Sequence, residues 1–271
     1  MCKTNDRKEK EMKQLKRLET QLLSLIILMI ISTAAFAQSK DTIYVYGPGG
    51  PFPPMNEAAK IFGQKNNVDI IVTKGPTYKW IETAKKNGDL IYSGAEFMMQ
   101  DFIWKMDGKI DENTVQPLYL RPSGLLVRKG NPKQIKGFED LLKRDLKVLV
   151  VNGAGQTALW EDMAGKLGEI STVKALRKKI VYVAHNSAEA KNVWMNNESI
   201  DVWLIWNIWQ ISNPNIADFV PVSEQYTFYR DCGVAMTKEG EKRSIVKKFY
   251  EYLMSKEAAT IFKKWGWITE Q

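Results

Sequence analysis

The hydrophobic residues show two kinds of spacing that alternate along the chain, one typical of strands and the other typical of helices. Short runs of β-branched and aromatic residues, typical of strands, stand at 42–46, 69–73 and 89–92. Segments with apolar residues three and four positions apart, typical of helices, follow from 53 to about 64, from 77 to about 86 and after 96. Pro53 and Pro54 suit a first helical turn, and Thr77 is a candidate N-cap.

The second half of the chain repeats this pattern after a crossing. Two strand-like stretches, 115–121 and 124–129, have no helix between them and predict a passage into a second lobe. Strands are then expected at 147–151, 180–184 and 200–205, and helices at 153–168, 171–179 and 187–197. Stretches 220–222 and 227–237 predict that the chain returns to the first lobe. Two amphipathic helices are expected at the end of the chain, and Ser255 is the expected cap of the last one.

The order of these elements predicts an α/β protein of two lobes, each a mainly parallel sheet flanked by helices, with two crossing segments. We expect residues 38–122 to form the first part of lobe 1 and residues 123–226 to form lobe 2. Residues 227–271 then supply the return strand and the C-terminal helices of lobe 1. A length of 271 residues is compatible with one or two domains.

The first 37 residues have the pattern of a secretory signal peptide. Basic residues are frequent from 3 to 17, an apolar run follows at 22–31, and small residues end with Ala35-Phe36-Ala37. The run is shorter than the roughly 20 apolar residues of a membrane span. We therefore expect export to the periplasm and a cut after Ala37, with Met12 as an alternative start and an uncleaved anchor as the alternative outcome.

Removal of this segment changes the charge and the cysteine content. The chain has 39 basic and 31 acidic residues, and loss of residues 1–37 leaves 32 and 27. The small excess of basic residues is not concentrated in one block of like charge, so nucleic acid is not an expected partner. Cys232 is then the only cysteine and His185 the only histidine. One cysteine cannot form an intrachain disulfide, and these two residues are too few for a zinc site built from Cys and His ligands alone. No cofactor or metal is expected.

Five strand-to-helix loops carry small or hydroxylated residues suited to binding an anion. In open parallel sheets, ligands bind beyond the carboxyl ends of the strands, where free N–H groups and helix dipoles favour negative charge. Turn formation alone explains any one such loop, but five loops around one cleft favour binding. The candidate residues are Gly49, Gly50, Thr77, Ser93, Gly94, Ala95, Gly155, Gln156, Thr157, Asn186 and Ser187.

Longer side chains near these loops extend the candidate site. Arg121 and Arg230 flank the two crossings, and Lys79 stands near a helix start. Arginine can hold a carboxylate or phosphate through two parallel hydrogen bonds, and surface solvation is the alternative role for each residue. Of the nine tryptophans, only Trp206 is expected at a strand end facing the cleft, and core or interlobe packing is expected for the others.

Enzymatic chemistry has weak support in the sequence. Residues 147–158 match a strand followed by G-x-G-x-x-A, but the next strand ends without the carboxylate that a dinucleotide site requires. Cys232 and His185 are a candidate nucleophile–base pair, although Cys232 lies in a strand expected to be buried. Glu161 and Asp162 would point about 100° apart on a helix. A degenerate hydrolase or lyase is therefore the least favoured alternative.

A set of short motifs, in order along residues 41–267, resembles one family. The motifs are G-P-G-G at 47–50, G-P-T-Y-K-W at 75–80, S-G-A-E at 93–96, P-L-Y-L-R at 117–121, K-G-N-P-K at 129–133, G-A-G at 153–155, W-E-D-M at 160–163, N-S at 186–187, Y-R at 229–230 and S-K-E-A with I-F-K-K-W-G-W at 255–267. Together they resemble the accessory colonisation factor AcfC family of periplasmic solute-binding proteins, which are distantly related to molybdate- and sulfate-binding proteins.

This resemblance implies a type II periplasmic-binding fold that closes on an anionic ligand, and it adds Tyr229 to the site beside Arg230. The chain departs from the family at one place. The family tends to have a longer Ser/Thr/Gly-rich stretch between G-A-G and W-E-D-M, whereas only residues 156–159 intervene here. The resemblance therefore extends to the fold and the anion class rather than to one particular ligand.

These observations favour an exported solute-binding protein, not an enzyme. We expect its two lobes to close on a small oxyanion or a carboxylated or phosphorylated acid, for ABC-type uptake. An ABC permease is a candidate partner, a homodimer is left open, and no membrane span is expected after cleavage. The alternative is an adhesin or a colonisation-associated surface antigen that uses the same fold.

The mature protein is expected to begin at Gln38, because the A-x-A site follows a short apolar run. N-terminal sequencing of exported protein measures this directly. An exported or membrane-bound form that retains residues 22–31 would instead indicate an anchor.

Overall fold

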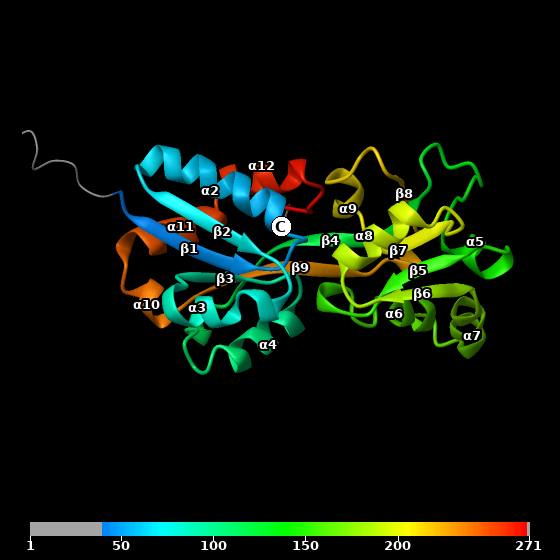
Figure 1. Ribbon diagram of the computed structural model, residues 1–271, viewed down its shortest axis with the longest axis horizontal. Helices are drawn as coiled ribbons and strands as arrows, with labels where there is room; N and C mark the ends of the chain where they lie inside the picture. The colour runs from blue at the N-terminus through cyan, green and yellow to red at the C-terminus, as the bar shows by residue number, and fades with distance from the viewer. Residues whose placement is uncertain (1–39, 270–271) are drawn as a thin grey trace, which may run out of the picture. The chain divides into compact units, whose positions relative to one another are not determined.

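Strands and helices alternate along the chain in the computed structural model, which describes residues 40–269 (Figure 1). Residues 42–269 form one compact unit. The fold is α/β with two lobes, each built on a sheet flanked by helices, as predicted. Among the described residues, no helix combines the length and the apolar character needed to cross a membrane. The expected signal peptide, residues 1–37, and its cleavage site lie outside the described residues.

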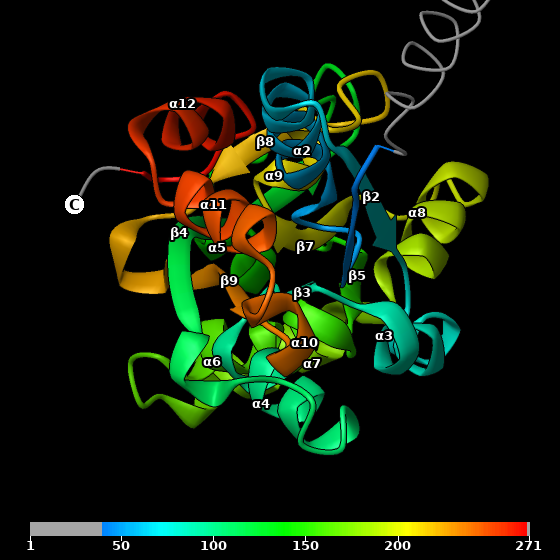
Figure 2. The same cartoon turned by 90° about the vertical axis from the view of Figure 1, so that its left-hand side faces the viewer.

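The first lobe is built on three parallel strands. β1 (Thr42–Gly47) lies between β2 (Asp69–Lys74) and β3 (Leu90–Tyr92) and is parallel to both. Helices cover both faces of these strands, as seen in Figures 1 and 2. On one face lie α2 (Phe52–Asn66), α11 (Ser244–Leu253) and α12 (Lys256–Lys264), and on the other α3 (Ile81–Asn87) and α4 (Glu96–Lys105).

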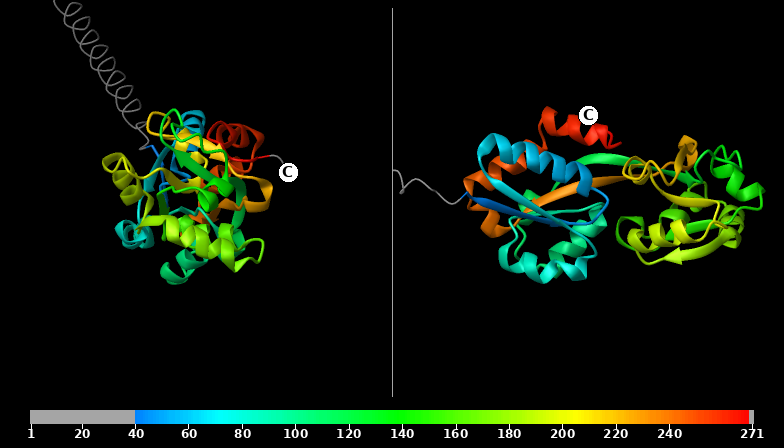
Figure 3. Two further views of the ribbon diagram at one scale, coloured as in Figure 1. Left: turned by 90° about the vertical axis from the view of Figure 1, so that its right-hand side faces the viewer. Right: turned by 45° about the horizontal axis from the view of Figure 1, so that its top comes forward.

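Two long strands connect the lobes. The first half of β4 (Gln116–Val127) pairs antiparallel with β9 (Tyr229–Met236), which pairs in turn with β3. The second half of β4 pairs antiparallel with β7 (Val202–Trp206) and β8 (Asp218–Pro221). Figure 3 shows both β4 and β9 running between the two groups of elements. The strand order is therefore continuous across the lobes, as β2-β1-β3-β9-β4-β7-β5-β6.

The second lobe repeats the parallel arrangement. β5 (Val148–Val151) lies between β6 (Ile180–Ala184) and β7 and is parallel to both. Its helices are α5 (Phe138–Lys143), α6 (Leu159–Gly165), α7 (Ile170–Lys179), α8 (Ser187–Asn196) and α9 (Ile208–Ile211). The chain also has α10 (Lys238–Glu241) and the short 3-10 helices η1 (Thr77–Lys79), η2 (Glu112–Thr114), η3 (Ala154–Gln156) and η4 (Glu224–Tyr226).

Some predicted boundaries are wrong for local backbone reasons. The two stretches expected at 115–121 and 124–129 form the single strand β4, because Ser123 N donates to Phe228 O and keeps the chain extended at the junction. The helix expected at 153–168 begins only at Leu159. Ala154 and Ala158 have φ values of 50° and 62°, and this left-handed backbone cannot continue a right-handed helix.

The predicted cap at Thr77 is also wrong, whereas the cap at Ser255 is confirmed. Thr77 begins η1, and α3 starts at Ile81 without a side-chain cap. The buried Trp80 separates the two helices, and its Nε1 donates to Gly75 O at 3.1 Å, which holds this segment in a tight turn. The Ser255 Oγ accepts a hydrogen bond from Ala258 N, as a capping side chain does.

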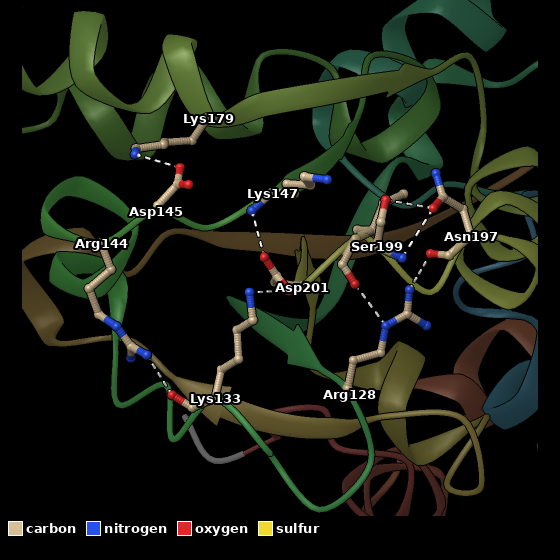
Figure 4. A network of polar contacts seen from close by, with 10 residues as sticks. Arg128, Lys133, Arg144, Asp145, Lys147, Lys179, Asn197, Ser199 and Asp201 are labelled. Atoms are coloured by element: carbon tan, nitrogen blue, oxygen red, sulfur yellow. Dashed lines mark hydrogen bonds and ion pairs between the residues drawn. The ribbon is translucent and has the colours of Figure 1, made fainter.

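Arg128, near the end of β4, joins that strand to the C-terminal end of α8 (Figure 4). Its guanidinium donates to the backbone oxygens of Ile200 at 2.7 Å, Trp194 at 2.9 Å and Asn197 at 2.6 Å. The guanidinium carbon also lies 3.7 Å from the centre of a Trp194 ring. The positive charge therefore satisfies carbonyl groups that the end of α8 leaves without helical partners.

Replacing Arg128 by alanine is expected to lower the free energy of unfolding by roughly 3 kcal/mol. One hydrogen bond to a charged group contributes about 1.5–3 kcal/mol, and three bonds from one group are not additive. Lysine should recover only part of the loss, because it lacks the planar fork. Urea denaturation measures these differences. The control is Arg177→Ala, on the exposed face of α7; an equal effect in both variants would contradict the special role of Arg128.

Candidate functional site

Loops that follow the carboxyl ends of strands in both lobes line one pocket of about 130 Å³. The loops after β1, β2 and β3 contribute from the first lobe, and those after β5 and β6 contribute from the second. This is where an open parallel sheet is expected to bind its ligand. The lining residues are Pro48, Gly49, Gly50, Pro51, Gly75, Pro76, Gly94, Met98, Arg121, Ala154, Gly155, Gln156, Asn186, Ser187, Ala188 and Trp209.

The pocket brings together half of the candidate residues from the sequence. These are Gly49, Gly50, Gly94, Arg121, Gly155, Gln156, Asn186 and Ser187. The apolar part of the lining, above all Met98 and Trp209, was missed, because a methionine or tryptophan within a helical pattern is indistinguishable from a core residue. The pocket therefore combines small loop residues, one cation and an apolar wall.

Arg121 on β4 is the one charged residue of the pocket lining, and its guanidinium is fully buried. It lies between the rings of Trp206 and Trp267, with its carbon 4.9 Å and 4.8 Å from their centres. Nη2 donates to Gly94 O at 2.5 Å and Nη1 to Asp231 O at 3.4 Å, while Nε has no hydrogen-bond partner among the described residues. Burial lowers the pKa of Arg121 to about 10.

No carboxylate within residues 40–269 forms an ion pair with this guanidinium. Its two hydrogen bonds go to neutral backbone carbonyls. The nearby Asp231 carboxylate favours the charged form of Arg121 but makes no direct ion pair with it. A buried charge without a direct ion-pair partner is costly, so this site favours an anion. The two aromatic faces supply part of the missing stabilisation, because the negative quadrupole of each ring attracts a cation.

Arg230 lies directly opposite Arg121 in the pairing of β9 with β4, but it has a different environment. Its Nη2 donates to Asp162 Oδ2 at 2.7 Å, and its guanidinium carbon lies 5.7 Å from the centre of the Phe97 ring. Arg230 does not line the pocket. Side chains opposite each other on neighbouring strands repel when both are positive. The Asp162 carboxylate neutralises the charge of Arg230 but forms no ion pair with Arg121.

Trp206 does not face the pocket as expected but is fully buried beneath it. Its Nε1 donates to Gly155 O at 3.2 Å, and its ring supports the Arg121 guanidinium. The position at the end of β7 was predicted correctly, but the packing of the indole under the loop could not be read from its position in the chain. Trp206 thus positions two residues of the pocket lining.

The loops of the two lobes approach closely at Gly94 and Gly155. A Cβ atom on Gly155 would lie 2.8 Å from Arg121 Nη2 and 2.9 Å from Gly94 O. A Cβ atom on Gly94 would lie 3.2 Å from the same nitrogen. A larger residue at position 155 would therefore collide with the backbone of Gly94, whereas one at position 94 would require the Arg121 guanidinium to shift.

Hydrogen bonds fix the second-lobe side of the pocket. Ser187 Oγ donates to Gln156 Oε1 at 3.1 Å and ties the loop after β5 to the start of α8. Asn186 Oδ1 accepts from Glu189 N at 3.0 Å and so caps α8. Asn186 thus lines the pocket while its side-chain oxygen caps α8.

The remaining candidates lie outside the pocket. Ser93 is fully buried, with its Oγ accepting from Gly233 N at 3.3 Å, and Ala95 is fully buried at the start of α4. Thr157 Oγ1 donates to Ala154 O at 3.1 Å within its own loop. Also outside the pocket lining are Thr77, Lys79, Trp206, Tyr229 and Arg230.

A pair of carboxyl groups, Glu96 and Asp231, lies beside Gly233 and was not expected from the sequence. The two oxygens Asp231 Oδ2 and Glu96 Oε1 would lie 3.1 Å and 3.6 Å from a Cβ atom on Gly233, so both groups converge on that glycine. Burial and the negative charge of Asp231 raise the pKa of Glu96 to about 7. Asp231 Oδ2 is buried and has no hydrogen-bond partner among the described residues, so water screens little of the charge that it presents to Glu96.

Other chemistry finds little support in the geometry. Cys232 is fully buried on β9, as predicted, and burial raises the pKa of its thiol. His185 lies on the surface at the end of β6, where its backbone N donates to Glu189 Oε2. Among residues 40–269, no group of three or more His, Cys, Asp and Glu side chains is arranged to hold a metal ion.

Comparison with known proteins matches nearly the whole described chain to one family. The family model of bacterial extracellular solute-binding proteins matches residues 43–268. A curated relative, the uncharacterized protein YvgK from Bacillus subtilis, is 42% identical over 50 residues, which are 18% of this chain and 16% of that protein. The narrower resemblance to accessory colonisation factors stays a prediction.

Solved structures of binding proteins share the fold. The chain is 32% identical to Peb3 from Campylobacter jejuni, with a TM-score of 0.78, covering 84% of this chain and 100% of that one. A structure of PEB3 with bound L-phospholactate gives 31% identity and a TM-score of 0.79 over the same shares. The sulfate-binding protein SubI from Mycobacterium tuberculosis is 18% identical, with a TM-score of 0.69 over 84% of this chain and 86% of that chain. At that identity the likeness shows the fold alone.

The pKa of Glu96 predicts that stability falls as the pH rises. A carboxyl whose pKa is raised on folding binds its proton more tightly in the folded state, so its stabilising contribution is complete below pH 4.5 and is lost as the pH rises towards about 7. Glu96→Gln should remove this dependence and unfold at higher denaturant concentration at pH 8. The gain is about 1 kcal/mol, because solvent screens the exposed side of the carboxylate.

Urea denaturation at a series of pH values between 4.5 and 8 measures this effect. The control is Glu161→Gln, at an exposed position on α6. Parallel pH profiles for the wild type and Glu96→Gln would contradict a raised pKa of Glu96 in the folded protein.

Proposed function

We propose that this chain, which belongs to the bacterial extracellular solute-binding proteins, binds a small carboxylated or phosphorylated acid, or a related oxyanion, in the pocket beside Arg121. In this role it performs no chemistry on its ligand. It delivers the ligand for uptake by an ABC permease after export and removal of residues 1–37.

The single observation that carries this proposal is the buried guanidinium of Arg121. It lines the pocket, has no ion-pair partner within residues 40–269, and keeps a nitrogen without a hydrogen bond. An anion in the pocket would supply a direct ion-pair partner in surroundings where water screens the interaction little. A neutral ligand would leave the guanidinium without such a partner.

The loops around Arg121 suit the same ligand class. Gly49, Gly50, Gly94 and Gly155 have no side chains beyond Cα, so an oxyanion can approach their backbone N–H groups. Ser187 adds a hydroxyl at the start of α8, where the helix dipole also favours negative charge. Met98 and Trp209 form an apolar wall, which favours an organic acid over a bare inorganic ion.

The relative with a named ligand agrees with this choice. L-Phospholactate, bound by PEB3, carries both a carboxylate and a phosphate. PEB3 is 31% identical to this chain over its own full length. A small acid with two anionic groups is therefore the first ligand to test.

We also propose how the lobes move. Residues 38–122 and 227–271 would form one body and residues 123–226 the other, with the hinge in β4 and β9. Closure on a ligand around such a hinge needs only a few backbone angles to change. The ion pair between Arg230 on β9 and Asp162 on α6 would stabilise the closed form.

Arg121→Ala is expected to weaken binding of L-phospholactate by about ten- to a hundredfold, because a hydrogen bond to a charged group contributes roughly 1.5–3 kcal/mol. Arg121→Lys keeps the charge without the planar fork and should give an intermediate loss. Gly155→Val should also weaken binding, since its side chain would enter the space between Gly94 and Arg121. Isothermal titration calorimetry measures the affinities.

Circular dichroism and urea denaturation establish that each variant is folded before its affinity is compared. Arg177→Ala, at an exposed site on α7, is the matched control and should bind like the wild type. Citrate, sulfate and L-phospholactate form the test panel. Equal affinities in the wild type and both folded Arg121 variants, or no binding of any of these anions, would contradict the proposal.

A further inference from the structure

A groove of about 510 Å³ lies on the surface of the first lobe, between η1, α3 and the C-terminal end of α4. Figure 1 shows α3 and α4 next to each other on the face opposite α2. No residue of the groove lines the pocket beside Arg121. Its volume falls within the range of about 300–1,000 Å³ that small-molecule sites occupy.

Two aromatic side chains in this groove are unusually exposed. Tyr78 is 76% exposed and Trp104 is 70% exposed. Within residues 40–269, neither side chain stacks on another ring or makes a side-chain hydrogen bond. By contrast, the neighbouring Trp80 is buried and packs against Tyr46 and Phe102. Tyr78 and Trp104 thus offer aromatic surface that folding does not use.

Charged groups between these rings are paired and balanced. Lys85 Nζ lies 2.8 Å from Glu82 Oε1 and 2.9 Å from Asp107 Oδ2. Lys105, also in the groove, pairs with Asp101 on its own helix. Two lysines and two carboxylates therefore line the groove, which leaves it without a net charge. They offer fixed hydrogen-bond donors and acceptors side by side.

The floor of the groove is packed against the apolar core. Ile81 is buried at the start of α3 and belongs to the apolar cluster formed by Trp80, Phe102 and Met106. Asp107 has a φ of 52°, and this left-handed turn after α4 brings its carboxylate back to Lys85. Binding groups held on helices with a packed support lose little freedom when a ligand binds.

We propose that this groove is a second binding site, one that takes a neutral saccharide. A pyranose ring has an apolar C–H face and a rim of hydroxyl groups, and these match separated aromatic faces and a line of paired charges. A peptide or an acyl chain would need a continuous apolar floor, whereas Ile81 is the one aliphatic residue of the lining. A charged ligand would gain little, because the lining is balanced.

The test follows the indole N–H signal of Trp104 by NMR while cellobiose, chitobiose, lactose or maltose is added. The signal is identified by its loss in Trp104→Phe. At least one of these sugars is expected to shift it in a saturable way. Calorimetric titration with that sugar needs no Trp104 signal and compares the variants. Trp104→Ala and Tyr78→Ala should each weaken binding at least about tenfold, and Trp104→Phe, which keeps an aromatic face, should weaken it less.

Two comparisons separate this site from the anion pocket and from a general effect of aromatic loss. Tyr182→Ala, at an exposed tyrosine on β6 of the other lobe, should bind the sugar like the wild type. Arg121→Lys should keep sugar binding, and Trp104→Ala should keep L-phospholactate binding, so the two proposals can fail independently. Sugar binding that Arg121→Lys abolishes would place the sugar in the anion pocket and overturn the second site.

Other results would also overturn it. One is the absence of any shift of the Trp104 signal up to the solubility limit of each sugar. Another is undiminished sugar binding by Trp104→Ala and Tyr78→Ala. A third is a Trp104 signal that responds to phosphatidylglycerol vesicles but to no sugar, which would identify the groove as a membrane-contact surface.

Discussion

The buried guanidinium of Arg121 is the interaction on which the centre of the molecule depends. It extends from the crossing strand β4, lies between Trp206 of the second lobe and Trp267 near the C-terminus, and donates to the backbone of Gly94 in the first lobe. Trp206 in turn holds the loop at Gly155. One cation thus joins segments that are far apart in the chain, and it does so without a carboxylate. Its charge stays available because aromatic faces and carbonyl dipoles stabilise it without neutralising it.

The elements of the fold could be predicted from local signals, because β-branched runs and cap residues act over a few positions. The runs at β1 and β6 and the cap at Ser255 are examples. The roles of Arg121 and Arg230 could not be separated in this way. Both residues flank a crossing, and they stand opposite each other in one strand pair. What distinguishes them is Asp162, a partner 68 positions from Arg230 in the chain.

The other residues of the site also depend on contacts between distant parts of the chain, which local sequence signals do not show. Glycine-rich turns identified the loops around the pocket, but which atoms face inward depends on packing between lobes. Trp206 was expected to face the ligand and is buried beneath the loop instead. Glu96 and Asp231 come from different elements, so no spacing in the sequence pointed to their pairing. Family membership covers residues 43–268 and fixes the architecture, whereas the chemistry of the pocket comes from these individual contacts.

The route of the chain through β4 and β9 also determines when the protein can become complete during synthesis. The first lobe begins with β1 and α2, yet α11 and α12, which pack against α2, are the last helices to be made. All strands that follow β4 in the second lobe are synthesised before β9 returns to pair with β3. The second lobe therefore has its full set of strands while the first still lacks β9, the strand that lies between β3 and β4. Until α11 and α12 are synthesised, the apolar faces of β1 and α2 stay exposed and can aggregate. Binding of chaperones is therefore most important during this period.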